Sequence, residues 1–223
     1  MVSTDPFESL RQRMIAVIAA QAVFSAGETT KPTIAPRVLE AMARVPRHEF
    51  VPAEVRPHAY ADTPLPIGCD KTISQPFICA LMTDLLDPGP HDTVLEIGTG
   101  LGYHAALLCG LAKMVYSIEI IEELAQQAKE RLVHCGCTNI KLRLGNGFYG
   151  WSDAAPFDRI LVTAAADLVP APLLRQLKPG GKMVIPTGLP DAQRLVLVEK
   201  EAGGKTTMKE LLRVRFALLE GAE

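Results

Sequence analysis

The stretch Thr93-Val94-Leu95-Glu96-Ile97-Gly98-Thr99-Gly100-Leu101-Gly102-Tyr103 indicates the fold of this chain. It begins as an apolar strand, continues through a glycine-rich turn and ends where a helix begins. Gly98 and Gly100 allow the backbone to turn sharply and to approach a ligand, and Gly102 allows the helix to pack closely on the strand. The pattern predicts a nucleotide-like ligand at the turn, although close packing alone would also explain these glycines.

Two acidic residues favour a cationic ligand that carries a ribose and no phosphate. The spacing is G-x-G-x-G, whereas dinucleotide-binding turns read G-x-G-x-x-G and place a pyrophosphate at the helix N-terminus. Glu96 at the end of its strand would oppose a pyrophosphate. Glu119 ends the next strand about 20 residues after the glycines, where an acid accepts hydrogen bonds from ribose hydroxyls. S-adenosylmethionine has a ribose, a sulfonium and an ammonium, and it is the predicted cofactor.

Length and composition favour one α/β domain. The chain has 223 residues, 48% of them hydrophobic, which is enough for one substantial core. We expect a single domain in which residues 1–91 form a helical and substrate-loop extension and residues 92–223 form the cofactor-binding core. The net charge is −2, without a long basic run, which argues against a nucleic-acid partner.

The cysteines and the N-terminal residues bear on metal content and location. Five cysteines, an odd number in mostly apolar surroundings, suit a reducing compartment. Cys135-Gly136-Cys137 lacks the second pair that a zinc site needs, so no metal is expected. The N-terminus lacks the pattern of a signal peptide, and no apolar run approaches the length of a membrane span. A cytoplasmic monomer without a membrane partner is the expectation.

The first third of the chain combines helices with a proline-rich segment. Apolar spacing predicts helices over 7–24 and 36–44, whereas 45–68 is expected to be irregular and functional. A third helix is predicted from Pro76 to about Leu86. Ser74 looks like its N-cap, with Pro76 in the first turn.

From Asp92 onward, strands and helices alternate. Strands are predicted at 93–97, 114–119, 140–144, 157–163 and 182–186, with helices at about 102–111, 121–135 and 171–177. Two last strands near 194–200 and 207–216 flank a glycine turn. This order predicts a doubly wound, mostly parallel sheet with an antiparallel edge, as in the class I S-adenosylmethionine-dependent methyltransferase (Rossmann-like) fold. Ligands then belong at the carboxyl ends of the first strands, where Glu96, Glu119 and Asn146 fall.

Several short motifs point to one family. They are Ala59–Gly68, Thr72–Pro76, Val94–Tyr103, Gly150-Trp151 with Ala155–Asp158, Val162–Ala165, and Leu177–Gly181. With them, the chain resembles protein-L-isoaspartate (D-aspartate) O-methyltransferases over nearly its whole length. The glycine turn is shared by many methyltransferases, whereas T-I-S-Q-P preceded by P-L-P-I-G is specific to this family.

The resemblance implies an activity and a site. Such enzymes methylate the carboxylate of L-isoaspartyl and D-aspartyl residues in damaged peptides and proteins, and the ester then leads to repair through a succinimide. Ser74 would be the catalytic residue and would hydrogen-bond the carboxylate. Predicted cofactor contacts are Thr72, Ile73, Ser74, Glu96, Gly98, Thr99, Gly100, Gly102, Glu119, Asn146 and Gly147, and predicted substrate contacts are Ser74, Thr163 and Ala164.

Three departures from the family pattern bear on affinity. Asn146 stands where an aspartate is usual, so an amide oxygen would contact the adenine amino group. The loop Gly68-Cys69-Asp70-Lys71-Thr72 replaces the usual G-x-G-Q-T. Ala217-Leu218-Leu219 replaces the usual Val-Pro-Leu. The first departure concerns the cofactor and the other two concern the substrate.

The proposed chemistry needs few catalytic groups, because a carboxylate with a pKa near 4 is already ionised at neutral pH and requires no general base. One alternative is another class I methyltransferase acting on a small molecule or RNA, against which stands the missing Asn/Asp-Pro-Pro-Tyr signature. A second is a non-catalytic adaptor of the same fold. A degraded glycine turn or a missing Ser74 would favour the adaptor, and both are intact.

Overall fold

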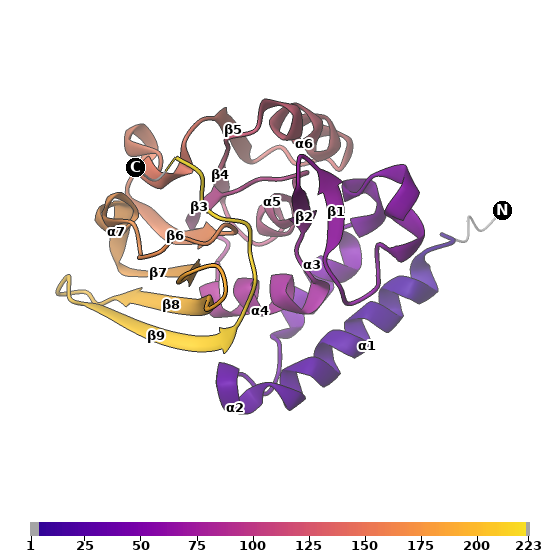
Figure 1. Ribbon diagram of the computed structural model, residues 1–223, viewed down its shortest axis with the longest axis horizontal. Coiled ribbons are helices and arrows are strands. Elements are labelled where there is room, and N and C mark those ends of the chain that lie inside the picture. The colour runs from indigo at the N-terminus through magenta and orange to yellow at the C-terminus, as the bar shows by residue number, and fades with distance from the viewer. Residues whose placement is uncertain (1–4, 222–223) are drawn as a thin grey trace.

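A seven-stranded sheet organises residues 5–221, the part of the chain that the computed structural model describes. The strand order is β5-β4-β3-β6-β7-β8-β9 (Figure 1). The strands are β3 (Thr93–Ile97), β4 (Met114–Glu119), β5 (Ile140–Leu144), β6 (Phe157–Val162), β7 (Leu177–Thr187), β8 (Arg194–Lys200) and β9 (Thr206–Arg213).

The pairing directions confirm the predicted architecture. Strands β5, β4, β3, β6 and β7 pair in parallel, whereas β8 runs antiparallel to both β7 and β9. The predicted strand positions agree closely, except that β7 begins at Leu177 and β9 ends at Arg213. Strand β7 therefore includes the Pro179-Gly180-Gly181 segment, which the sequence placed before the strand.

Helices and short 3-10 turns cover both faces of the sheet (Figure 1). The helices are α1 (Glu8–Phe24), α2 (Ala26–Thr29), α3 (Pro36–Arg44), α4 (Pro76–Leu86), α5 (Tyr103–Cys109), α6 (Glu122–His134) and α7 (Ala171–Gln176). One buried cluster joins α1, α3, α4, α5 and α6 to one face through residues such as Val94 and Val115. A second cluster, with Trp151 and Leu173, covers the other face. Since the first cluster runs across residue 91, the extension shares its core with the sheet.

A short hairpin lies inside the segment that was predicted to be irregular. Strands β1 (Leu65–Gly68) and β2 (Lys71–Ile73) pair antiparallel. Cys69 and Asp70 form the turn with φ of +51° and +54°, the conformation of a two-residue hairpin loop, which the sheet's twist favours. Strands of three or four residues beside prolines are too short to produce a readable alternation. The departure at Cys69-Asp70 thus falls at the tip of this hairpin.

The C-terminal residues leave the sheet earlier than predicted. β9 ends at Arg213, and the following residues cross the carboxyl ends of the parallel strands (Figure 1). We call residues 214–220 the roof segment. Ala165 holds it by backbone hydrogen bonds, since its N–H donates to Ala217 O at 2.8 Å and its carbonyl accepts from Leu219 N at 2.7 Å.

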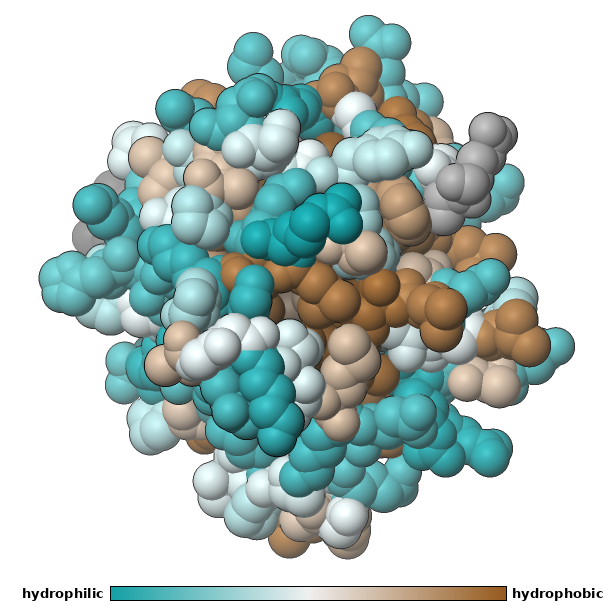
Figure 2. Space-filling model, turned by 90° about the vertical axis from the view of Figure 1, so that its left-hand side faces the viewer, coloured by the Kyte–Doolittle hydropathy of each residue, from teal (hydrophilic) through white to brown (hydrophobic). Residues whose placement is uncertain are grey.

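On the side of the molecule that carries α7 and the C-terminal end, apolar side chains gather in a band bordered by polar ones (Figure 2). Leu168 and Leu218 are among the large apolar side chains that are exposed. Within residues 5–221, no helix combines the length and apolar character needed to cross a membrane. The same residues hold no group of three or more His, Cys, Asp or Glu side chains placed to bind a metal ion.

Candidate active site

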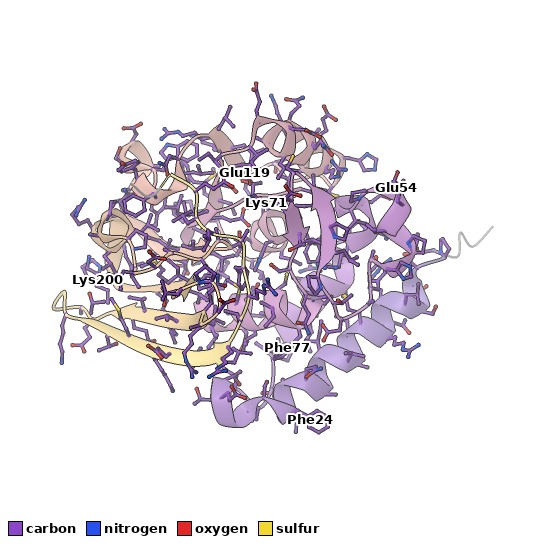
Figure 3. The ribbon with its side chains drawn as sticks, viewed as in Figure 1. Phe24, Glu54, Lys71, Phe77, Glu119 and Lys200 are labelled. Carbon is purple, nitrogen blue, oxygen red and sulfur yellow. The ribbon has the colours of Figure 1, made fainter. Side chains whose placement is uncertain are left out.

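A cavity of about 460 Å³ lies at the carboxyl ends of β3 and β4, between the β1–β2 hairpin and the roof segment. Its size is that of a site for a ligand as large as a nucleoside. Lys71 from β2 and Glu119 from the end of β4 both reach it (Figure 3). The apolar part of the lining includes Ile67, Ile78, Ile97, Ile118, Ile120 and Leu124.

The glycine turn lies against neighbouring atoms so closely that side chains would collide there. Gly98 has φ of +93°, and a Cβ on it would lie 2.4 Å from Thr163 Oγ1. That hydroxyl donates to Gly98 O at 2.7 Å and is 3.0 Å from Ile97 O. A Cβ on Gly102 would lie 3.1 Å from Leu132 in α6, so this glycine lets α5 approach α6, whereas the sequence had placed the close contact against the strand.

Glu119 ties the glycine turn to the start of α6. Its Oε2 accepts a hydrogen bond from Gly100 N–H at 2.8 Å, and its Oε1 accepts from the N–H groups of Ile120 and Ile121, each at 3.0 Å. The side chain is 6% exposed and lines the cavity. A carboxylate oxygen can accept about two hydrogen bonds, so Oε2, which accepts one within the protein, can also accept from a ligand's hydroxyl.

Ser74 lies on the cavity wall in a turn that other residues hold. It does not cap α4, and the N-cap interpretation of Ser74 is wrong. Asp62 does this work instead, since its Oδ1 accepts from Phe77 N–H at 2.8 Å and its Oδ2 from Gln75 Nε2 at 2.7 Å. Because this cap comes from a residue outside the helix, the Ser74 hydroxyl is not used to cap α4.

Arg47 supports the same turn from the opposite side. Its side chain is fully buried and donates to Ala59 O and to Ser74 O, both at 2.7 Å. The guanidinium also lies 4.7 Å from the centre of the Tyr103 ring, which favours a buried cation. The position of Ser74 is therefore fixed by its carbonyl and by the residues that follow it.

Glu96 is buried behind the cavity wall and does not line the cavity. Ser117 Oγ donates to its Oε2 at 2.5 Å, and Thr99 Oγ1 lies 2.6 Å from Ser117 Oγ. Its Oε1 has no hydrogen-bond partner among the described residues. Burial raises the pKa of Glu96 to about 8, although the Ser117 hydrogen bond acts in the opposite direction.

Asn146 uses its side-chain amide within the protein. Its Oδ1 accepts from Phe148 N–H at 2.9 Å and so caps a 3-10 turn, while its Nδ2 donates to Gly221 O at 2.8 Å. Gly147 beside it lines the cavity, where a Cβ would lie 2.3 Å from Ile97 Cγ2. The amide oxygen that the sequence assigned to adenine is thus engaged with the backbone.

The structure brings most of the predicted site residues to one cavity. Those that line it are Thr72, Ser74, Gly98, Gly100, Glu119, Gly147, Thr163 and Ala164. The predicted site residues that do not line it are Ile73, Glu96, Thr99, Gly102 and Asn146.

Comparison with known proteins assigns the family. A sequence model described as protein-L-isoaspartate(D-aspartate) O-methyltransferase matches residues 20–223. The chain belongs to this family. Protein-L-isoaspartate O-methyltransferase 1 of Polaromonas sp. (strain JS666) is 61% identical over 99% of this chain and 94% of its own length. Protein-L-isoaspartate O-methyltransferase 2 of Syntrophobacter fumaroxidans is 53% identical over 97% of this chain and 88% of its own. The family resemblance seen in the sequence is confirmed.

Solved structures agree with the fold. A structure named protein-L-isoaspartate O-methyltransferase matches with a TM-score of 0.82 at 26% identity, covering 95% of this chain and 66% of that one. A Plasmodium falciparum structure described as a complex with S-adenosyl-L-homocysteine has a TM-score of 0.78 at 22% identity and covers 96% of this chain and 97% of its own. The predicted methyltransferase fold is confirmed.

The roof segment is the longest continuous part of the cavity lining that the sequence did not assign. All residues from Arg213 to Glu220 line the cavity, although only the departure at Ala217-Leu218-Leu219 hinted at a role. Lys71 Nζ lies 2.5 Å from Glu220 Oε1 and joins the roof segment to the hairpin. A sequence pattern shows such a contact poorly, because the partners lie 149 residues apart.

Glu96 predicts a pH dependence of stability in the protein without cofactor. Its carboxyl stays protonated in the folded protein up to about pH 8, whereas in the unfolded chain it ionises near its usual pKa of about 4.3. Between these values the unfolded chain binds fewer protons, so this contribution to the free energy of unfolding is complete below the lower pKa and declines as the pH rises toward the higher one. As the pH rises from about 5 to about 8, the melting temperature of the Glu96→Gln variant should therefore fall less than that of the parent. Parallel losses in parent and variant would contradict the raised pKa.

Proposed function

We propose that this protein transfers a methyl group from S-adenosylmethionine to the carboxylate of L-isoaspartyl and D-aspartyl residues in damaged peptides and proteins, which begins their repair through a succinimide. The observation that carries the proposal is the single cavity that joins the glycine turn, Glu119 and Ser74 in a chain of this family.

The residues present fit the cofactor. Glu119 lies at the end of β4, where its carboxylate can accept hydrogen bonds from ribose hydroxyls. Gly98, Gly100 and Gly147 line the cavity, where their backbone can approach a ligand closely. Apolar residues such as Ile118 and Leu124 offer a surface for adenine. S-adenosylmethionine supplies a sulfonium-activated methyl group, which an anionic carboxylate accepts directly.

The chain's own residues bind and orient the substrate. A carboxylate is ionised at neutral pH, so the protein needs to hold it in line and has no need for a general base. We propose that the Ser74 hydroxyl donates to that carboxylate, and that Thr163 and Ala164 contact the peptide beside it. Attack of an anion on a cation reduces charge separation, so a cavity with apolar walls that excludes water favours the reaction.

The test is methyl transfer to a synthetic isoaspartyl peptide beside its normal aspartyl twin. Methyl ester should form on the isoaspartyl peptide and not on the twin. Equal rates on both peptides, or transfer to neither, would contradict the proposed function. Binding of S-adenosylhomocysteine by calorimetry, with no binding of NAD, checks the cofactor separately.

We further propose a monomer that acts in the cytoplasm on proteins and not on nucleic acid. All five cysteines carry free thiols, which suits a reducing compartment. Sedimentation of the purified protein tests the oligomeric state.

Substitution of Glu119 should weaken cofactor binding. Glu119→Ala removes an acceptor for the ribose and three backbone hydrogen bonds, and S-adenosylhomocysteine affinity should fall by about 1.5–3 kcal/mol, the range for hydrogen bonds to a charged group. Glu119→Gln keeps one acceptor oxygen and should lose less. Calorimetry on both variants measures the difference, and unchanged affinity in Glu119→Ala would remove the ribose assignment.

A further inference from the structure

The roof segment begins where the β8–β9 pairing stops, and one residue takes over from the sheet at that point. Gln193 precedes β8, and its backbone carbonyl accepts from Val214 N–H at 3.1 Å. Its side-chain Oε1 then accepts from Phe216 N–H at 2.6 Å, and its Nε2 donates to Phe216 O at 3.1 Å. The amide thus pairs with both polar groups of one roof residue, as a neighbouring strand would.

Burial protects this clamp from water better than the other polar side-chain attachments near the roof segment. Gln193 is 3% exposed, so leaving its partners unpaired would cost free energy. The Lys71–Glu220 ion pair is more exposed, with 24% and 51% of the two side chains accessible, and exposed pairs of this kind contribute little. The hydrogen bond from Asn146 to Gly221 is also at the surface.

We propose that Gln193 is a positioning residue for methyl transfer, whose side-chain amide holds the roof segment in place over the cavity. Gln193 does not itself line the cavity, whereas every residue that it positions beyond β9 does. The inference rests on the proposed function, because it concerns how the isoaspartyl peptide is bound beside Ser74. A loosened roof should weaken peptide binding more than it slows transfer at saturating peptide.

The first test is the KM for an isoaspartyl peptide. Gln193→Ala should raise this KM roughly tenfold, which corresponds to the loss of two side-chain hydrogen bonds of ordinary strength, with a smaller change in kcat. Gln176 provides a matched control, because its Oε1 accepts from Trp151 N–H and its Nε2 donates to Tyr149 O, both at 2.8 Å, away from the cavity lining. Because Gln176 is half-buried and its bond to Tyr149 is exposed, Gln176→Ala should lower the melting temperature by less than Gln193→Ala, and it should leave the peptide KM near that of the parent.

The second test uses protonation to restore the clamp. In Gln193→Glu, an ionised carboxylate would accept from Phe216 N–H but face Phe216 O without a proton to donate, whereas the neutral acid can do both. Because burial favours the neutral acid, the KM of this variant relative to the parent should fall as the pH is lowered from about 8 to about 6. Gln176→Glu should show no such change in relative KM.

The outcomes separate the inference from the proposed function. If the parent does not methylate the isoaspartyl peptide, the proposed function fails and the inference with it. If the parent is active and Gln193→Ala melts lower with an unchanged KM, Gln193 is only structural and the inference alone is overturned. If Gln193→Ala does not fold, Gln193→Glu decides, since a pH-independent relative KM overturns the inference and a KM restored at lower pH supports it.

Discussion

Replacing Ser74 by alanine should lower kcat/KM for an isoaspartyl peptide by roughly 10-fold to 100-fold, the loss expected when a hydrogen bond to a charged group is removed. The folded structure should change little, because Asp62 caps α4 and Arg47 holds the Ser74 carbonyl. Ser74→Thr keeps the hydroxyl and should give an intermediate rate. Initial rates, cofactor affinity and melting temperature are to be measured on the same preparations.

Asp62→Ala is the matched control for this prediction. It removes the acceptor for Phe77 N–H and for Gln75 and should cost about 1 kcal/mol of stability, as other lost helix caps do. Ser74→Ala should therefore melt near the parent while losing activity, whereas Asp62→Ala should melt lower. A Ser74→Ala variant that turns over like the parent would end the catalytic assignment.

The parallel strands and the glycine turn could be predicted because their physical signals are local. Strands covered on both faces are mainly apolar, as in 93–97 and 114–119, where Glu96 and Ser117 are the buried exceptions, and the carboxyl ends of these strands meet at one edge of the sheet. Glu119 could be placed at the cavity by this rule alone. Glu96 could not, because the side chain one residue before the strand end points away from the cavity that Ile97 lines.

The residues that were missed depend on partners distant in sequence. The cap of α4 comes from Asp62, which accepts a hydrogen bond from the N–H of Phe77, 15 residues further along the chain. A local capping pattern therefore wrongly favoured Ser74. The roof segment continues the apolar alternation of β9, but it pairs with the Gln193 side chain and with Ala165 instead of with β8. Pattern reading therefore extended the strand to residue 216. The β1–β2 hairpin was hidden by its length and its prolines.

The second large effect is expected at the glycine turn, where Gly98→Ala should destabilise the fold and impair cofactor binding. Its φ of +93° disfavours any residue with a Cβ, and that Cβ would lie 2.4 Å from Thr163 Oγ1. Thr163 is stiff at χ1, and rotating it away would break its hydrogen bonds to Ile97 O and Gly98 O. Strain and overpacking together should cost about 2–5 kcal/mol of the free energy of unfolding.

Three further variants, Gly204→Ala, Thr163→Ala and the double variant of Gly98 and Thr163, separate these causes. Gly204 in the β8–β9 turn has φ of +86° and nothing within 4 Å of an added Cβ, so Gly204→Ala should show the backbone strain alone, about 1–2 kcal/mol. Combining Gly98→Ala with Thr163→Ala removes the colliding oxygen, so the double variant should be more stable than the sum of the two single losses. Denaturant unfolding measures the parent and the four variants, and calorimetry with S-adenosylhomocysteine follows the cofactor. A Gly98→Ala variant as stable as Gly204→Ala would mean that Thr163 moves aside without cost and that the turn's close approach is not what requires glycine.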